Sequence, residues 1–360
     1  MTAIRLNSFL LAFALAATSA GAIAGGDDQG PAVADLSLAV AAQGKLPELN
    51  ADEYFKGSTP GTFGKDIVTV LPNSKRVAVA GFRVVYVVES SASAHVRSSY
   101  LPGGVEKTAA HSSIDVKLAG IDNATLQAIT DKAYANFLEQ LKAAGREVVP
   151  PEQVAPLYAK LDLAKTSPDA PYRHDVGGKV GVAFSPTGVP LWWTIQDKYG
   201  DVGPFNQTNM RAVPPFSQEL NAFVIAPMIV VDFAKMGSSG NHSALINDEA
   251  KVDATLRMAV PVMSTTITRA TDTKGGLLSS GDEGFFKLTK ALVVDQEFAT
   301  METVEEEKSS KMMAFLTGSA KSSKKLTATT DNARYSAVAS QVLNQATGAL
   351  ARYFQQHPAQ

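Results

Sequence analysis

The stretch Val77-Ala-Val-Ala-Gly-Phe-Arg-Val-Val-Tyr-Val-Val88 is almost continuously apolar and rich in β-branched residues. A run of this kind is typical of a strand that is buried on both faces of a sheet. Arg83 is its one charged residue, and we interpret it as a structural charge at a strand end or in an ion pair. The stretch is therefore the first strand that we expect in the core.

The residues that follow alternate between strand and helix patterns. Residues 113–118 alternate apolar and polar side chains, as a half-exposed strand does. Apolar residues then recur at helical spacing between Asp122, an N-cap candidate, and Gly145, which suits a left-handed helix end. Residues 146–149 indicate a short strand, and residues 152–163 a second amphipathic helix. This order predicts helices packed on a sheet.

The second half of the chain is richer in strand patterns. Residues 179–184 form one candidate strand, and residues 222–233 another, in which Pro227 requires an edge position or a bulge. Residues 251–263 alternate apolar and polar side chains, and we expect them to pair in antiparallel fashion with a strand near residues 285–298.

The last 60 residues contain a charged segment and a helix. Residues 301–330 carry the run Glu305-Glu306-Glu307 and then Lys321, Lys324 and Lys325 among serines and threonines, and we interpret them as a solvated helix followed by a mobile polar loop. A long amphipathic helix is predicted after Asp331. The expected fold class is therefore α/β (α+β), with a mixed sheet, packed helices, a strand-rich second half and a long C-terminal helix.

Composition and charge limit the possible functions. The chain has 360 residues, of which 45% are hydrophobic and 19% are charged, as in ordinary globular proteins. Its 33 basic and 35 acidic residues give a formal net charge of -2, which disfavours a nucleic-acid partner held by a strong positive field. The sequence contains no cysteine, which excludes a disulfide framework, a thiolate metal site and a cysteine nucleophile.

The first 24 residues have the anatomy of a secretory signal peptide. Arg5 precedes a short apolar core at residues 9–17, and Ala22-Ile23-Ala24 matches a small-residue cleavage pattern. The apolar core is too short to span a bilayer as a helix, and no later stretch reaches about 18 apolar residues. We expect cleavage after Ala24, and the dense use of alanine indicates a bacterial periplasmic or secreted protein.

The chain is expected to have three parts. Residues 1–24 are the signal peptide, residues 25–75 are a flexible N-terminal extension, and residues 76–360 are a single α/β domain. That domain contains an unusual insertion at residues 185–222, which is rich in proline and in aromatic residues.

Catalytic and metal-binding patterns are missing from the sequence. It has no Walker loop, no G-x-G-x-x-G, no G-x-S-x-G and no H-E-x-x-H. Asp232 is well placed for a catalytic carboxylate at the end of an apolar strand, but no partner base can be assigned to it. We expect no catalytic residue, no metal and no cofactor, because the histidines also lack ligand-like spacing: His95, His111, His174, His242 and His357.

The insertion at residues 185–222 is the candidate binding region. Long ordered connections are disproportionately functional, and both tryptophans of the chain lie side by side within this one. Adjacent residues of a strand point to opposite faces, so both indoles cannot enter one core. The candidate ligand-binding residues are Trp192, Trp193, Tyr199 and Phe205; the alternative is that these rings only pack beneath the loop.

The order of elements resembles the superfamily of curli-secretion-channel and penicillin-binding-protein-activator lipoproteins. The resemblance covers about two thirds of the mature chain: residues 77–82 as first strand, 126–149 as helix and strand, and residues 222–233 and 251–263 as later strands before a closing helix. It implies a non-enzymatic protein, associated with the outer membrane, that acts by assembly or by binding a partner. The lipidated cysteine of that superfamily is absent.

These observations favour an exported, non-enzymatic protein of the cell envelope that binds an envelope protein or glycan. Peripheral membrane association and oligomer formation stay open. Two alternatives also stay open: a periplasmic hydrolase or carbohydrate-active protein whose carboxylates meet only in the fold, and a secreted structural or adhesive protein.

Overall fold

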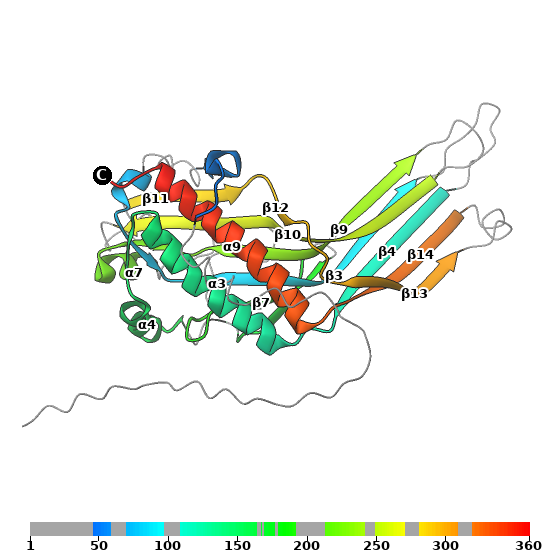
Figure 1. The fold of residues 1–360 in the computed structure, drawn as a ribbon, viewed down its shortest axis with the longest axis horizontal. Coiled ribbons are helices and arrows are strands. Elements are labelled where there is room, and N and C mark those ends of the chain that lie inside the picture. The colour runs from blue at the N-terminus through cyan, green and yellow to red at the C-terminus, as the bar shows by residue number, and fades with distance from the viewer. Residues whose placement is uncertain are drawn as a thin grey trace, which may run out of the picture.

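The architecture is that of an α/β protein with one large mixed sheet and helices packed on it (Figure 1). The strands are β1 (Phe55–Ser58), β2 (Arg76–Val79), β3 (Arg83–Val96), β4 (Ala109–Ala119), β5 (Glu147–Val148), β6 (Tyr172–Val176), β7 (Lys179–Phe184), β8 (Phe223–Ile225), β9 (Met228–Asn241), β10 (Glu249–Ala270), β11 (Gly281–Leu288), β12 (Leu292–Val294), β13 (Thr300–Lys308) and β14 (Ser319–Thr329). The helices are α3 (Asn123–Ala143), α4 (Pro151–Lys160), α7 (Val213–Leu220) and α9 (Asn332–Gln356). The computed structural model describes residues 46–58, 70–96, 109–163, 167, 169–176, 179–191, 213–241, 249–270, 281–308 and 319–360.

Parallel and antiparallel pairs are mixed in the sheet, as expected from the sequence. Its continuous path runs β13-β14-β4-β3-β9-β10-β8-β2-β5, and the other described strands attach beside it. The pairs β14–β4, β3–β9, β2–β8 and β2–β5 are parallel, whereas β3–β4, β9–β10 and β13–β14 are antiparallel. The fold class predicted from the sequence is thereby confirmed.

The apolar stretch that begins the core forms two strands rather than one. Residues 77–87 are all buried, as predicted, but the chain leaves the sheet after β2 and re-enters it with β3. The break follows from pairing, because β2 lies between β5 and β8, whereas β3 pairs with β4, β7 and β9. Arg83 is the first residue of β3, and it is buried at this strand end.

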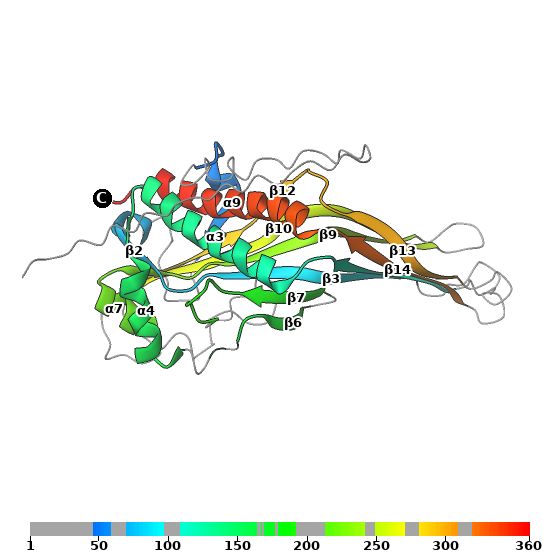
Figure 2. The ribbon, with the colours of Figure 1, turned by 60° about the horizontal axis from the view of Figure 1, so that its bottom comes forward.

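Helices cover both faces of one part of the sheet. In Figure 2, α3 and α9 lie on one side of it, and α4 and α7 lie on the other. The larger core includes Phe137 of α3 and Leu350 of α9, whereas a second core joins Ala78 and Val224 of the sheet to Leu157 of α4 and Phe216 of α7. The central strands are buried on both faces because each face has its own helical layer.

The two long helices begin side by side, next to the end of strand β14. The side chain of Asp122 caps α3 by accepting a hydrogen bond from the backbone N–H of Thr125 (2.7 Å), and it also accepts one from Asn332 Nδ2 (2.7 Å). Asp331 caps α9 in the same way. Both predicted caps are confirmed, and Gly145 has the predicted left-handed conformation, with a φ of +82°.

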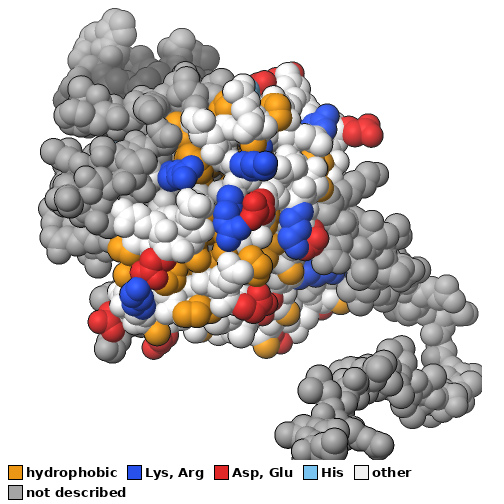
Figure 3. Space-filling view, turned by 90° about the vertical axis from the view of Figure 1, so that its left-hand side faces the viewer, with side chains coloured by type: hydrophobic (Ala, Val, Ile, Leu, Met, Phe, Trp, Pro, Cys, Tyr) orange, Lys and Arg blue, Asp and Glu red, His pale blue; other side chains and the backbone are white. Residues whose placement is uncertain are grey.

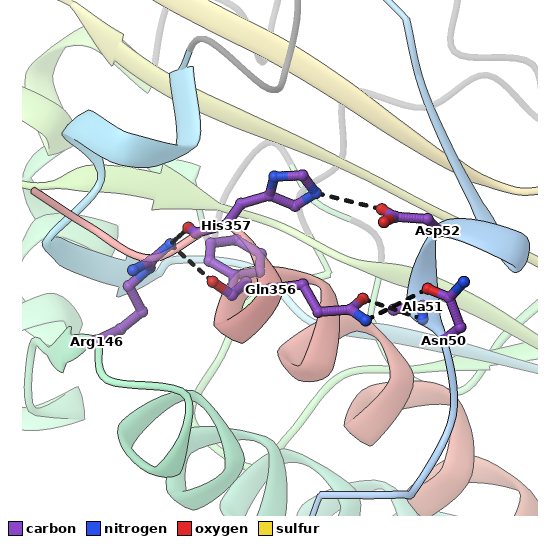
Figure 4. A network of polar contacts seen from close by, with 7 residues as sticks. Asn50, Ala51, Asp52, Arg146, Gln356 and His357 are labelled. Carbon is purple, nitrogen blue, oxygen red and sulfur yellow. Dashed lines mark hydrogen bonds and ion pairs between the residues drawn. The ribbon is translucent and has the colours of Figure 1, made fainter.

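Part of the segment expected to be a flexible extension is packed against the domain. Ala51 is fully buried, Phe55 stacks edge-on against Tyr353 with ring centroids 6.1 Å apart, and β1 pairs with β11. Figure 4 shows the polar contacts that complete this attachment: the backbone N–H of Ala51 donates to Gln356 Oε1 (3.1 Å), and His357 Nε2 lies 3.2 Å from Asp52 Oδ1. For residues 46–58, the expectation of flexibility is therefore wrong.

The end of α9 is held by a buried arginine (Figure 4). Arg146 Nη2 donates to the carbonyl oxygens of Phe354 (3.1 Å) and His357 (2.6 Å), and its guanidinium lies over the Phe354 ring. A positive charge at a helix C-terminus is favourable because the last carbonyls carry partial negative charge. Desolvation lowers the pKa of Arg146 to about 10.

The described parts of residues 301–330 form the strands β13 and β14 and not the predicted solvated helix and polar loop; residues 309–318 lie outside the described residues. β13 and β14 extend the sheet at one edge, and β14 runs parallel to β4. The acidic and basic clusters face each other across this pair, with Lys325 Nζ 2.7 Å from Glu305 Oε2 and Lys324 Nζ 3.4 Å from Glu306 Oε1. The charges therefore match a partner strand rather than one face of a helix.

The remaining strand predictions are confirmed with one refinement. Pro227 separates β8 from β9, so the predicted strand at residues 222–233 is divided at the proline. β10 pairs with β11 and β12, which is the predicted antiparallel pairing, but its longest partner is β9.

Candidate functional site

The binding residues predicted from the sequence lie outside the described residues. These are Trp192, Trp193, Tyr199 and Phe205, and their role stays a prediction. The described ends of the 185–222 insertion are part of the core: Leu191 is buried, and the ring of Phe216 contacts that of Tyr158 with centroids 5.6 Å apart.

Asp232 has a partner that the sequence did not reveal. It lies in β9, where the register between β9 and β10 shifts on both sides of the pair Asp232–Ala259. Such irregularities redirect a side chain. Its carboxylate forms an ion pair with Lys179 of β7, and its Oδ1 accepts a hydrogen bond from the backbone N–H of Ala234 (3.3 Å).

The surroundings of Asp232 point to a structural role. The side chain of Asp232 is only 6% exposed, and both of its oxygens are occupied, one by Lys179 and one by a backbone N–H. Tyr335 is fully buried near this pair, and burial raises its pKa well above the usual value, with Tyr86 and Asp232 adding to the effect. Removing one partner of a buried ion pair is costly because the other charge is then left uncompensated.

The most distinctive surface lies where the strands extend beyond the helices. In Figures 1 and 2, β3, β4, β9, β10, β13 and β14 continue past the first turns of α3 and α9. We call the outer part of four of these strands the distal sheet, and define it as residues 90–96 of β3, 109–116 of β4, 303–308 of β13 and 321–326 of β14. It is built by the β3–β4, β4–β14 and β13–β14 pairs.

The two faces of the distal sheet differ in chemistry. On the inner face the side chains are small or apolar, and Ala94, Val96, Ala110 and Ile114 are buried. Strand β10 contacts β3 and β4. The side chains of the outer face are polar and, with few exceptions, exposed or half-buried: Ser91, Ser93, His95, His111, Ser113, Asp115, Lys321, Ser323 and Lys325.

The outer face is organised in rows of side chains that run across the strands. Ser93, Ser113 and Ser323 occupy neighbouring positions on β3, β4 and β14, and Ser113 Oγ donates to Ser323 Oγ (3.2 Å). In the next row toward the helices, Asp115 lies beside Lys325, and a hydrogen bond from Lys325 to Glu305 raises the pKa of the lysine.

His95 and His111 form the row closest to the tip of the distal sheet. They are direct partners across the antiparallel β3–β4 pair, and their ring centroids are 6.2 Å apart. Sequence reasoning missed this pair because sixteen positions separate the two residues. The signal that could have revealed it is Gly103, within Pro102-Gly103-Gly104, which lies eight residues from each histidine.

The outer edge of the distal sheet is strand β13, which carries features that oppose further strand pairing. It has four glutamates, and its register with β14 shifts between Thr303 and Glu305. Charged side chains and bulges on an edge strand are the usual protection against unwanted pairing. Val304, at this shift, is 70% exposed and is the one exposed large hydrophobic side chain among the described residues. The edge of the distal sheet is therefore protected against pairing with a further strand.

At the opposite end of the molecule, the described side chains that Figure 3 shows do not form ordered rows like those of the distal sheet. Figure 3 views that end, and lysine, arginine, aspartate and glutamate side chains are scattered over it among hydrophobic ones. Such a mixed surface is ordinary for a globular protein.

Comparisons with known proteins do not assign the chain to a family. No protein-family model matches it, and neither a curated protein nor a solved structure is significantly similar to it. The resemblance to the curli-secretion-channel superfamily thus stays a prediction. Over the described part of the chain, no helix has the length and apolar character needed to cross a bilayer, and no group of three or more acidic or histidine side chains is arranged to hold a metal.

Proposed function

We propose that this chain is an exported, non-enzymatic component of the bacterial cell envelope, and that the outer face of the distal sheet binds another envelope component. The observation that carries the proposal is the extension of the strands beyond the helices, which leaves a polar strand face without a helical cover. Export is inferred from the signal-peptide pattern of residues 1–24.

Energetics support a recognition role for this extension. Ordering each backbone residue costs about 1–2 kcal/mol of conformational entropy. Apolar burial offsets that cost, but in the distal sheet only the inner face supplies it. A strand surface whose outer side chains stay outside the core is well suited to present these side chains to a partner.

The chemistry of the outer face fits a polar partner. Serine hydroxyls, imidazoles and charged groups of both signs lie in rows at fixed spacing, and each can donate or accept hydrogen bonds. We therefore place an envelope protein or a glycan first among the partners. The non-enzymatic part of the proposal is supported by Asp232, whose oxygens are occupied by Lys179 and a backbone N–H.

Site-specific photo-crosslinking in cells that export the full chain tests the proposal. A photoreactive residue at Ser93, which is exposed on the outer face, is compared with one at Gln153, which is exposed on α4 away from the distal sheet. We expect a discrete high-mass adduct from position 93 and none from position 153. No adduct from Ser93, or the same adducts from both positions, would contradict the assignment of the outer face.

The aromatic residues of the insertion need a separate test. Both tryptophans lie at positions 192 and 193, so selectively excited tryptophan fluorescence reports on this insertion alone. A shift in emission on adding peptidoglycan fragments would support Trp192 and Trp193 as a second contact region. Unchanged, blue-shifted emission would instead assign both rings to packing.

A further inference from the structure

The two histidines at the tip of the distal sheet have the placement of a chelating pair. His95 and His111 are partners in the antiparallel β3–β4 pair, so their side chains leave the sheet on the same face. His95 is exposed and His111 is half-buried. The ring centroids are 6.2 Å apart, and the ring planes are inclined at 60°.

We propose that His95 and His111 bind a divalent transition-metal ion through one nitrogen of each ring. Metal–nitrogen bonds are about 2.0–2.1 Å long, so an ion between two imidazoles holds their centroids between about 5 Å, at a tetrahedral angle, and about 6.4 Å, in a linear arrangement. The observed centroid separation of 6.2 Å falls within this range. Closing the angle to tetrahedral requires each ring to move by less than about 1 Å, which small changes of the side-chain torsions allow.

The ligand chemistry selects the class of metal. Imidazole nitrogen suits Cu²⁺, Ni²⁺ and Zn²⁺, whereas Ca²⁺ and Mg²⁺ require several oxygen ligands. Two protein ligands leave the other coordination positions to water or to a group from a binding partner. The affinity order expected for nitrogen ligands is Cu²⁺ above Ni²⁺ and Zn²⁺.

The neighbouring strand sets the electrostatics of the site. Lys321 of β14 is the register partner of His111, and Ser113 lies one row further toward the helices. A positive charge on the neighbouring strand opposes the binding of a divalent ion, although water and salt weaken the effect. The pair is therefore an exposed, exchangeable site rather than a closed structural one.

Isothermal titration of the full chain with Cu²⁺ tests the site. We compare the natural chain with His95→Ala and His111→Ala, and use His357→Ala as the matched control, because His357 lies against Asp52 at the other end of the molecule. Two linked ligands gain about 100-fold or more in affinity over one. Each of the first two variants should therefore bind about 100-fold more weakly, and the control should be unchanged.

Two further measurements make the result specific. Lys321→Gln should bind Cu²⁺ about two- to fivefold more tightly because a nearby positive charge is removed. Paramagnetic resonance of the 1:1 complex should show two equivalent nitrogen ligands, and circular dichroism should show that all variants are folded. The proposal is overturned if either His95→Ala or His111→Ala binds within threefold of the natural chain, if His357→Ala loses affinity equally, or if Lys321→Gln weakens binding.

Discussion

Replacing Gly120 with alanine should disrupt the junction from which both long helices start. Gly120 follows β4 and has a φ of +92°, a region that favours glycine. A Cβ atom at this position would lie 1.9 Å from the carbonyl oxygen of Thr330. Thr330 in turn donates its backbone N–H to the carbonyl of Ala119 (3.1 Å), which ties the end of β14 to the end of β4.

The size of the effect follows from three contributions. The left-handed conformation costs alanine about 1–2 kcal/mol. The overlap with Thr330 cannot be relieved without moving backbone by more than 1 Å, since real Cβ contacts are essentially never below 3.0 Å. Overpacking of this kind costs about 1–3 kcal/mol, and the lost backbone hydrogen bond about 1 kcal/mol more. The free energy of unfolding should fall by about 3–6 kcal/mol.

Gly145 provides a matched control for this substitution. Its φ is +82°, close to that of Gly120, but a Cβ at position 145 would meet nothing within 4 Å. Gly145→Ala should therefore lose only the conformational part, about 1–2 kcal/mol. Urea unfolding followed by circular dichroism measures both variants. Equal losses of stability for Gly120→Ala and Gly145→Ala would refute the steric argument.

Two further predictions concern the ends of the helices. Hydrogen bonds from the backbone and side chain of Thr125 lower the pKa of Asp122. This carboxylate therefore stabilises the folded state at neutral pH, and its contribution disappears as the pH falls through the folded-state pKa. The difference in the free energy of unfolding between the natural chain and Asp122→Ala, measured in urea, should shrink in acid, and a constant difference would contradict this. Arg146→Met should reduce the free energy of unfolding by about 1.5–3 kcal/mol, because charge-assisted hydrogen bonds to the carbonyls of Phe354 and His357 are lost. Amide exchange in the last turn of α9 should also become faster. Unchanged exchange there would contradict the role of Arg146 in holding the end of α9.

Local sequence patterns were sufficient for α3, α4 and α9, but not for α7, which lies within the insertion predicted at residues 185–222. The start of α3 at Asp122, the start of α9 at Asp331 and the left-handed residue Gly145 were all predicted, because a cap and an apolar stripe depend on residues within a few positions of each other. The half-exposed strand at residues 113–118 was recognised for the same reason.

Patterns that depend on distant partners were misinterpreted. The glutamates near residue 305 and the lysines near residue 325 look like a solvated helix and loop until they are placed on opposite strands. The stretch from Val77 to Val88 was predicted as one strand, because its division depends on the different strands that pair with β2 and with β3; Arg83, the one charged residue of the stretch, marks the start of β3.

The sequence by itself determined which segments are apolar, where the long helices begin and that the fold combines helices with a mixed sheet, because those properties arise from neighbouring residues. Only the tertiary structure decided that Lys179 neutralises Asp232, that residues 46–58 pack on α9 and that His95 faces His111. The physical reason is that strand register and the packing of layers join residues far apart in the chain, and that the free energy of these contacts depends on the fold as a whole.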